Sequence, residues 1–317
     1  MTMRLIGLSC GPADGSSDLL LKAALRGAED AGVEVAHVRL GDLDLSAAAG
    51  PMTAGAAGED DAGWFWDTLM ESDGLIVSTG VFNRTIPGRL KLLLDRLLGP
   101  KADVAFAREY LRKRDAGEEA TVRFPFDERV LRPRVAGFLA VGGALTDHWK
   151  TLTLPLLHHL TFSMQIGVVD QVQFGGAGIP AAIALDADAL ERAALLGRNV
   201  AEQAGHAFDD VEFRGTPGLC PMCHLDLIAV RGGGEVECAT CGARGVATAD
   251  PHSDGITITF TPEGLAQSVL TEVEKHEHFL EVQETALRQF AQAEQIAAGG
   301  AELRAFDRTL RPERAAR

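Results

Sequence analysis

The sequence lacks long apolar runs and is poor in aromatic residues, with one tyrosine in 317 residues. No apolar run reaches the roughly 18 residues of a membrane span. The N-terminus, MTMRLIGLSCG, has no charged segment followed by a long apolar stretch, so we expect no signal peptide. Positive charge is also scarce, since 30 Lys and Arg stand against 45 Asp and Glu for a net charge of −15. Nucleic acids and anionic membranes bind clustered positive charge, so we expect neither as a partner.

Cysteine is scarce as well, and its placement is informative. Four of the five cysteines form two C-x2-C pairs, and Cys10 stands alone near the N-terminus. Without a secretion signal, this pattern indicates metal binding in a reducing compartment rather than disulfides. We therefore expect a cytoplasmic protein, in which Cys10 is a small core residue rather than a nucleophile.

The first two hundred residues alternate between strand-like and helix-like segments. Strands are expected at 4–9, 33–40, 74–79, 135–141 and 168–174, and helices at 18–31, 60–71, 88–98, 152–164 and 186–204. This alternation predicts an α/β fold, a flavodoxin-like doubly wound five-stranded parallel sheet. Such sheets bind ligands at the carboxyl ends of their strands, so the loops after the first, third and fourth strands are the candidate site.

The composition divides the chain into three parts. Residues 1–207 are predicted to form the flavodoxin-like domain, with an Ala- and Gly-rich loop at 46–58 and an insertion at 101–133. We expect this insertion either to lean over the ligand cleft or to be a surface decoration or oligomer contact. Residues 208–260 hold the cysteine pairs, and 261–317 are predicted to be a long helix and a tail. Thr261 as N-cap and Pro262 in the first turn mark the start of that helix.

The loop after the first strand reads SCGPADGSS, from Ser9 to Ser17. It leads into a helix N-terminus, where amides and hydroxyls can hold a phosphate with help from the helix dipole. The loop lacks the Gly-Lys-Ser/Thr ending of a nucleoside-triphosphate loop and does not match G-x-G-x-x-G. A plain turn that caps the helix is the alternative.

The loop after the third strand runs TGVFNRTIPG and leads into Arg89-Leu90-Lys91 and Asp95-Arg96. This pattern resembles that of the NADPH-dependent FMN reductase and flavodoxin-like quinone reductase families. Their Ser-Pro-Val/Ile-Tyr motif is followed by Leu-Lys and Asp-Arg at the same spacing. The first loop and the segment VGGALT, residues 141–146, resemble two further loops of these families, so the resemblance covers roughly residues 3–205.

The resemblance implies an FMN cofactor, NAD(P)H as co-substrate and the following site. It assigns the phosphate to Ser9, Gly11, Ser16 and Ser17, one ring edge to Thr79, Gly80, Val81, Phe82, Asn83 and Arg84, and the other side of the ring to Gly142 and Gly143. Backbone amides from Gly80 to Asn83 would bind N5, O4 and the pyrimidine region. Ala13 replaces a frequent phosphate-binding Arg, and Gly80 and Phe82 replace the usual Pro and Tyr.

Histidines follow the third candidate loop. His148 is a candidate proton donor, since its unperturbed pKa lies near working pH; a partly buried polar contact is the alternative. His158 and His159 lie on an apolar helix, where at least one is expected to be a core histidine.

The cysteine pairs are predicted to form a zinc ribbon. Cys220, Cys223, Cys238 and Cys241 give C-x2-C pairs separated by 14 residues, as required for a closed Zn²⁺ site with four thiolates. An iron centre of the rubredoxin type would use the same ligands. The surrounding residues carry little positive charge or aromatic surface, which argues against nucleic acid and for a structural role.

Taken together, the sequence predicts an FMN-dependent oxidoreductase that passes hydride from NAD(P)H to a small organic acceptor, such as a quinone, an enone, a nitro compound or flavin. The first alternative is an electron-transfer protein, or a supplier of reduced flavin, for a partner oxygenase. The second is a non-catalytic scaffold that uses the ribbon for contacts. The resemblance also implies a homodimer or homotetramer, with the long helix as a possible contact.

Overall fold

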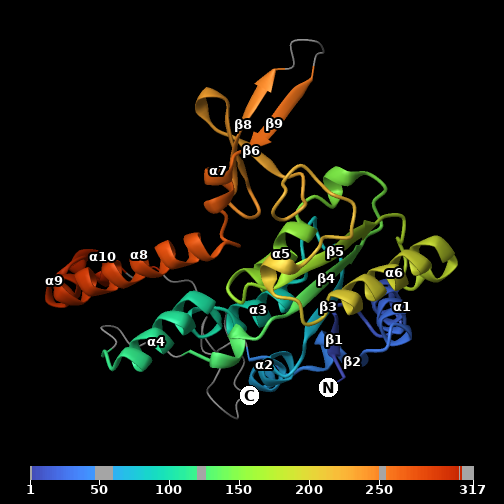
Figure 1. Cartoon of the computed structure of the whole chain (residues 1–317), viewed down its shortest axis with the longest axis horizontal. Helices are drawn as coiled ribbons and strands as arrows, with labels where there is room; N and C mark the ends of the chain where they lie inside the picture. The colour runs from blue at the N-terminus through green and yellow to red at the C-terminus, as the bar shows by residue number, and fades with distance from the viewer. Residues whose placement is uncertain (1, 47–59, 120–125, 250–254, 307, 309–317) are drawn as a thin grey trace.

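The computed structural model describes residues 2–46, 60–119, 126–249, 255–306 and 308, and Figure 1 shows their arrangement. The first sheet contains β1 (Arg4–Ser9), β2 (Glu34–Arg39), β3 (Gly74–Gly80), β4 (Val135–Val141) and β5 (Gly167–Phe174). All neighbours are parallel, in the order β2-β1-β3-β4-β5. The predicted doubly wound fold is confirmed. Of the predicted loop at 46–58, only Ser46 lies within the described residues.

Helices cover both faces of this sheet because its strands are apolar on both sides. The helices are α1 (Ser16–Asp30), α2 (Ala62–Met70), α3 (Gly88–Leu97), α5 (Thr153–Phe162) and α6 (Ala187–Gln203). Leu5 and Leu139 face α1 and α6, whereas Ile6 and Phe138 face α2, α3 and α5. Each predicted helix is present, with ends shifted by up to two residues.

The insertion lies away from the ligand edge of the sheet. Its helix α4 (Val104–Ala116) follows the end of α3, and the amide of Val104 donates to the carbonyl of Ser163, just after α5, at 3.0 Å. Helices α3 and α5 both start at the carboxyl ends of strands and run back to the amino ends. The expectation that the insertion leans over the cleft is therefore wrong, because the chain re-enters the sheet from the opposite edge.

The second sheet is antiparallel and stands apart from the first (Figure 1). It contains β6 (Ile228–Val230), β7 (Glu235–Cys238), β8 (Arg244–Ala249) and β9 (Ile256–Phe260), paired in chain order. With the cysteine pairs it forms the predicted ribbon, and we call residues 215–260 the ribbon. The exact domain boundaries stay a prediction.

The prediction of one continuous long helix after residue 261 is wrong. Helix α7 (Pro262–Ala266) ends after one turn, and α8 (Glu272–Ala291), α9 (Ala293–Ala298) and α10 (Ala301–Ala305) follow. Thr261 caps α7 as expected, with Gly264 N donating to its Oγ1 at 3.1 Å. The break occurs because Thr271 Oγ1 donates to the carbonyl of Ala266 at 2.7 Å and caps α8 at Glu274 N.

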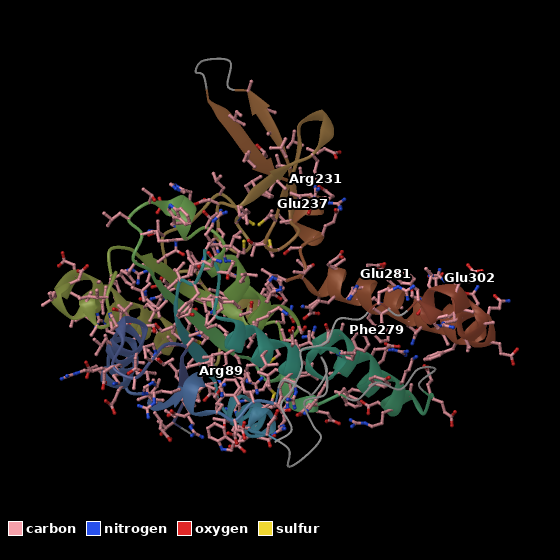
Figure 2. All side chains as sticks on the ribbon, turned by 180° about the vertical axis from the view of Figure 1, so that it is seen from behind. Arg89, Arg231, Glu237, Phe279, Glu281 and Glu302 are labelled. Atoms are coloured by element: carbon pink, nitrogen blue, oxygen red, sulfur yellow. The ribbon has the colours of Figure 1, made fainter. Side chains whose placement is uncertain are left out.

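Helices α8, α9 and α10, which we call the arm, extend beside α4 (Figure 1). Phe279 points toward α4 and meets Phe106 edge to face at 4.8 Å, while Glu281 lies on the far side (Figure 2). Val273, Leu280 and Phe290 are exposed on the arm. The predicted homo-oligomer stays a prediction. No described helix is long and apolar enough to cross a membrane.

Candidate active site and metal centre

The loops after β1, β3, β4 and β5 meet at the carboxyl edge of the first sheet. The amide of Val81 donates to the carbonyl of Val141 at 2.8 Å, which ties the third-strand loop to β4. The amide of Gly142 donates to the carbonyl of Phe174 at 3.1 Å, and Ile183 N lies 3.5 Å from Ser16 Oγ. The three predicted loops therefore border one region, joined by a fourth loop that the sequence did not single out. We call this region the crevice.

The first loop presents unfilled donors at the start of α1. Its N-cap, Gly15, supplies no side-chain hydrogen bond to the first turn. Ser9 Oγ is buried beside the carboxylate of Asp18, whose pKa its hydroxyl helps to lower, and it makes no hydrogen bond of standard geometry among the described residues. A Cβ atom at Gly11 would clash with Ser17 Oγ, so glycine lets the backbone pass close to that hydroxyl. These features suit an anion held by amides and hydroxyls.

The cations near this loop are already paired. Lys22 Nζ lies 2.6 Å from Asp14 and 2.8 Å from the buried carboxylate of Asp18, which also meets His37 at 3.1 Å. Burial raises the pKa of Asp18, but the hydrogen bonds from Lys22 and from the amide of Asp14 outweigh it and leave the pKa below its usual value. A phosphate here would thus be bound with no free cation from the described residues of this loop and α1, in keeping with Ala13 at the position where the family resemblance led us to expect Arg.

The loop after β3 closes into a tight turn. Phe82 and Thr85 exchange backbone hydrogen bonds of 2.8 and 2.9 Å, and both central residues have positive φ, 52° at Asn83 and 75° at Arg84, as in a type I′ turn. The amides of Val81 and Phe82 are consumed within the protein. Among the described residues, those of Asn83 and Arg84 have no partner, so they are the donors that this loop offers to a ligand.

The histidines lie in different environments: His158 is the core histidine that the sequence predicted, and the alternative of a partly buried contact for His148 is wrong. His148 is exposed, on the 3₁₀ turn Asp147–Trp149 that follows the β4 loop, with its ring 5.9 Å from that of Trp149. His158 is fully buried, and its Nε2 lies 2.7 Å from Gln171 Oε1. Burial lowers the pKa of His158 to about 4, so this ring is a neutral core residue. Cys10 is also buried, and burial raises the pKa of its thiol, which confirms a core role.

Large apolar side chains stand exposed around the crevice. Phe82 on the β3 loop and Trp149 after the β4 loop are 49% and 54% exposed. Leu145, Ile179 and Leu185, on the loops after β4 and β5, are exposed to an even greater degree. We call these five residues the apolar rim. Because these side chains stand on adjoining loops, the apolar rim is the candidate surface for an apolar molecule or partner.

The four paired cysteines come together at the base of the ribbon. Their Sγ atoms all lie within 4.8 Å of one another, with Cys220 to Cys241 at 3.6 Å and Cys223 to Cys238 at 3.5 Å. A tetrahedron with Zn–S bonds of about 2.3 Å has S–S edges of about 3.8 Å, close to these distances. All four are buried and none forms a disulfide.

The electrostatics of this cluster call for a cation. Hydrogen bonds among the four sulfur atoms lower the pKa of Cys220 and Cys238 and raise the pKa of Cys223 and Cys241. Cysteine binds metal as the thiolate, and a bound dication would compensate the charge of four thiolates. The predicted ligand set is assembled, and the donors fit a soft or borderline metal ion.

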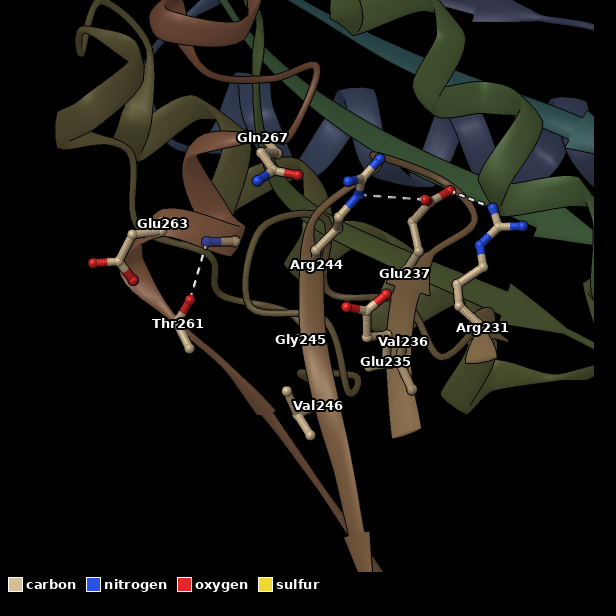
Figure 3. A pocket seen from close by; sticks show the side chains of 11 residues that line it. Arg231, Glu235, Val236, Glu237, Arg244, Gly245, Val246, Thr261, Glu263 and Gln267 are labelled. Carbon is tan, nitrogen blue, oxygen red and sulfur yellow. Dashed lines mark hydrogen bonds and ion pairs between the residues drawn. The ribbon is translucent and has the colours of Figure 1, made fainter. Parts of the chain in front are cut away.

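Another hollow, of about 630 Å³, lies on the ribbon surface (Figure 3). Glu237 forms ion pairs there, 2.8 Å from Arg231 and 3.6 Å from Arg244, and Glu235 and Glu263 also line the hollow. The hollow contains none of the residues of the four loops at the carboxyl edge of the first sheet.

Comparisons with known proteins agree with this geometry. The profile of the family described as NADPH-dependent FMN reductase matches residues 3–178. Flavone synthase cfoJ from Aspergillus candidus is 37% identical over 257 residues, 77% of each chain. Iron-sulfur flavoprotein MJ1083 from Methanocaldococcus jannaschii is 26% identical over 212 residues, 63% of this chain and 96% of that protein. The solved structure of a flavone reductase matches with a TM-score of 0.80 at 27% identity, covering 98% of this chain and 100% of that one.

Proposed function

The chain belongs to the NADPH-dependent FMN reductase family, and from this premise we propose that its acceptor is a flat, largely apolar aromatic enone of the flavone type. The enzyme is an NAD(P)H-dependent FMN oxidoreductase, which removes the scaffold alternative. The apolar rim is the observation that carries the choice of acceptor, because an aromatic molecule gains most where large apolar side chains are exposed beside the reaction centre. Two relatives, a flavone synthase and a flavone reductase, are named for the same class of molecule and support this choice.

The residues of the crevice suit the cofactor. When bound, FMN accepts hydride from NAD(P)H and delivers it to the acceptor. Ser9, Ser16, Ser17 and the first turn of α1 would hold the phosphate, and Gly11 lets the chain approach it. The amides of Asn83 and Arg84 would bind the ring edge, and Gly142 and Gly143 would leave room beside its other side. Thr79 and Gly80 end β3 beneath that edge, and Val81 and Phe82 shape the turn.

The reaction would be the reduction of a conjugated double bond. A hydride adds to the carbon β to the carbonyl, a proton adds to the α carbon, and the C=C bond becomes single while NAD(P)H becomes NAD(P)⁺. We propose His148 as the proton donor, since it is exposed beside Trp149 at the rim. Its neighbour Trp149, together with Phe82 on the loop after β3, would stack on the aromatic rings of the acceptor.

We also propose that the four cysteines hold structural Zn²⁺. The sulfur spacing and complete burial of the cluster support a closed site, in which all four positions are filled by thiolates and none is open to substrate. The ribbon would then position the arm and wall the crevice without taking part in the chemistry.

The acceptor is tested by anaerobic turnover of a flavone with NADPH and FMN, followed by mass analysis for a product heavier by two hydrogens. Trp149→Ala should raise KM for the flavone about tenfold, which corresponds to 1.4 kcal/mol, and leave ferricyanide reduction unchanged. Trp64→Ala is the matched control, because Trp64 on α2 is 53% exposed but lies outside the four loops. Full ferricyanide turnover with no flavone consumed would exclude this acceptor and favour the electron-transfer alternative.

A further inference from the structure

A buried lysine lies at the crevice and has no role in the function described so far. Lys150 follows the 3₁₀ turn after β4 and is only 5% exposed. Its ammonium lies beside Gly175, where an added Cβ atom would stand 3.3 Å from Nζ. The same Cβ would stand 3.5 Å from Leu145 Cα, so the ammonium sits where the loops after β4 and β5 meet.

The position of Lys150 is fixed from both sides. Its amide donates to the carbonyl of Asp147 at 2.8 Å, and its carbonyl accepts from Thr153 N at 3.1 Å. Thr153 Oγ1 in turn donates to the carbonyl of Arg84 at 3.1 Å, in the turn after β3. Lys150 is thereby anchored, through the start of α5, to the turn whose free amides face the crevice.

The charge of Lys150 is poorly compensated within the protein. Among the described residues its one ionic partner is Asp147, 3.2 Å away, and the side chain of Asp147 is 96% exposed. Water screens such a partner strongly, so it offsets little of the free energy spent in burying an ammonium group. By contrast, buried Lys275 far from the crevice donates to the carbonyl of Phe162. A buried cation with only a solvated counter-ion is arranged to meet negative charge that arises during the reaction.

We propose that Lys150 compensates the delocalised oxyanion that forms in the crevice when hydride moves. The chemistry allows two sources of that charge: the N1–C2 carbonyl region of the flavin ring as it takes up hydride, or the carbonyl oxygen of the enone, which becomes an enolate when hydride adds to the β carbon. In the flavin the negative charge would be shared between N1 and the C2 carbonyl oxygen, and in the enone it would lie on the carbonyl oxygen. A fixed ammonium would stabilise either anion before a proton arrives. The second source rests on the proposed acceptor, whereas the first requires only FMN.

The experiment compares Lys150→Met and Lys150→Arg with the unmodified full chain loaded with FMN. If the flavin carries the charge, Lys150→Met should weaken binding of reduced FMN relative to oxidised FMN at least tenfold. That factor lowers the midpoint potential by about 30 mV for a two-electron couple. If the enolate carries it, the potential stays constant and kcat with a flavone falls at least tenfold, while ferricyanide reduction is unchanged. Lys150→Arg should restore most of either loss.

Controls separate this role from a structural one. Lys113→Met, on α4 at the opposite edge of the sheet, should change neither readout. Asp147→Asn removes the exposed partner and should move the affected readout in the direction opposite to Lys150→Met, which gives a test even if Lys150→Met fails to fold. A folded, FMN-bound Lys150→Met whose potential and flavone kcat both stay within twofold would overturn the proposal. Wild-type protein that binds FMN but leaves flavones untouched would exclude the acceptor alone, since the potential is measured without one.

Discussion

The two sheets of this chain reach stability by different means. The strands β1, β3 and β4 are almost wholly buried, and helices pack apolar side chains on both of their faces. In the ribbon, β8 and β9 are mostly exposed, and the buried hydrophobic side chains among its described residues are the four cysteines with Leu225, Val236 and Ala243. One sheet is large enough to bury a core, and the other gathers four sulfur atoms where a core would be.

This difference shows how a small module can be stable when it is added to an enzyme. An unfolded chain loses about 1–2 kcal/mol of backbone entropy for each residue that it orders. The first sheet recovers this by apolar burial, while the ribbon has too few apolar side chains to do so. The structural metal proposed above would supply the missing free energy locally, so the ribbon could be attached to β5 without rebuilding the flavin domain.

Removal of the metal should have the largest effect on stability. It tests directly whether the ribbon depends on a metal where the first sheet depends on an apolar core. Structural Zn²⁺ in zinc-finger peptides contributes about 10–16 kcal/mol, so Cys238→Ser or a strong chelator should unfold the ribbon. The first sheet should keep its fold and its FMN. Hydrogen exchange of amides in 228–249, together with metal analysis, checks both halves of this prediction.

Cys10→Ala is the control, because it removes a cysteine outside the cluster and should leave one zinc per chain. Unchanged protection of 228–249 in metal-free protein would contradict the idea that metal replaces a core. An iron-thiolate absorption would show that the metal is iron rather than zinc, and the contrast between a metal-dependent ribbon and an apolar first sheet would still hold.

The sequence predicted the first sheet well because buried elements carry the clearest periodicity. Runs such as 135–141 are apolar throughout, as a central parallel strand requires, and the helices between them show regular apolar stripes. The cysteine spacing likewise predicted the cluster, since two C-x2-C pairs leave little freedom in how four sulfur atoms can meet.

Other features were missed because their signals are weak or depend on tertiary structure. The break at 267–271 was missed because the apolar stripe continues from one side of it to the other. Thr271 and Glu274 nevertheless have the spacing of a capping box, which marks the start of a new helix. The turn at Asn83 and Arg84 needs positive φ, which Arg rarely adopts. No sequence pattern marks Lys150, since a lysine before a helix is usually exposed.

The arm provides a third case, in which a charged group is buried where the arm meets the flavin domain at a cost to stability, and its predicted effect is intermediate. Burial lowers the pKa of Lys275 to about 8, with Asp103 acting in the opposite direction and Arg108 in the same direction. The unfolded chain has a pKa near 10.4 and binds more protons between these values, so stability should rise as pH increases from 8 to 10. Lys275→Met should remove this rise, which amounts to at most about 3 kcal/mol.

Urea unfolding at pH 7.5 and pH 9.5 measures the difference for each protein. Glu274 and His278 also line the hollow beside Lys275, so the comparison is made between variant and parent at the same pH. Lys91→Met, at an exposed position on α3, should retain the full rise. The same rise in Lys275→Met would mean that other groups produce it.

The smallest expected effect concerns the contact that joins the two sheets. Gln171 on β5 is buried; its Nε2 donates to the carbonyls of Cys223 at 2.9 Å and His224 at 3.1 Å, and its Oε1 lies 2.7 Å from His158 Nε2. Gln171→Leu would leave these groups unpaired, at about 1–3 kcal/mol of unfolding free energy. Because the loop that carries Cys223 would lose its hydrogen bonds to β5, zinc release should also become faster.

Gln173 supplies the matched control for this contact, because it lies two residues further along the same strand and therefore on the same face. Its Oε1 is buried with no hydrogen-bond partner among the described residues, so Gln173→Leu should be neutral or slightly stabilising. If Gln171→Leu lowers stability and accelerates zinc release while Gln173→Leu does neither, the two sheets are coupled through this one side chain. Equal behaviour of the two variants would mean that the core and the metal stabilise their sheets independently, with the chain connection as their main link.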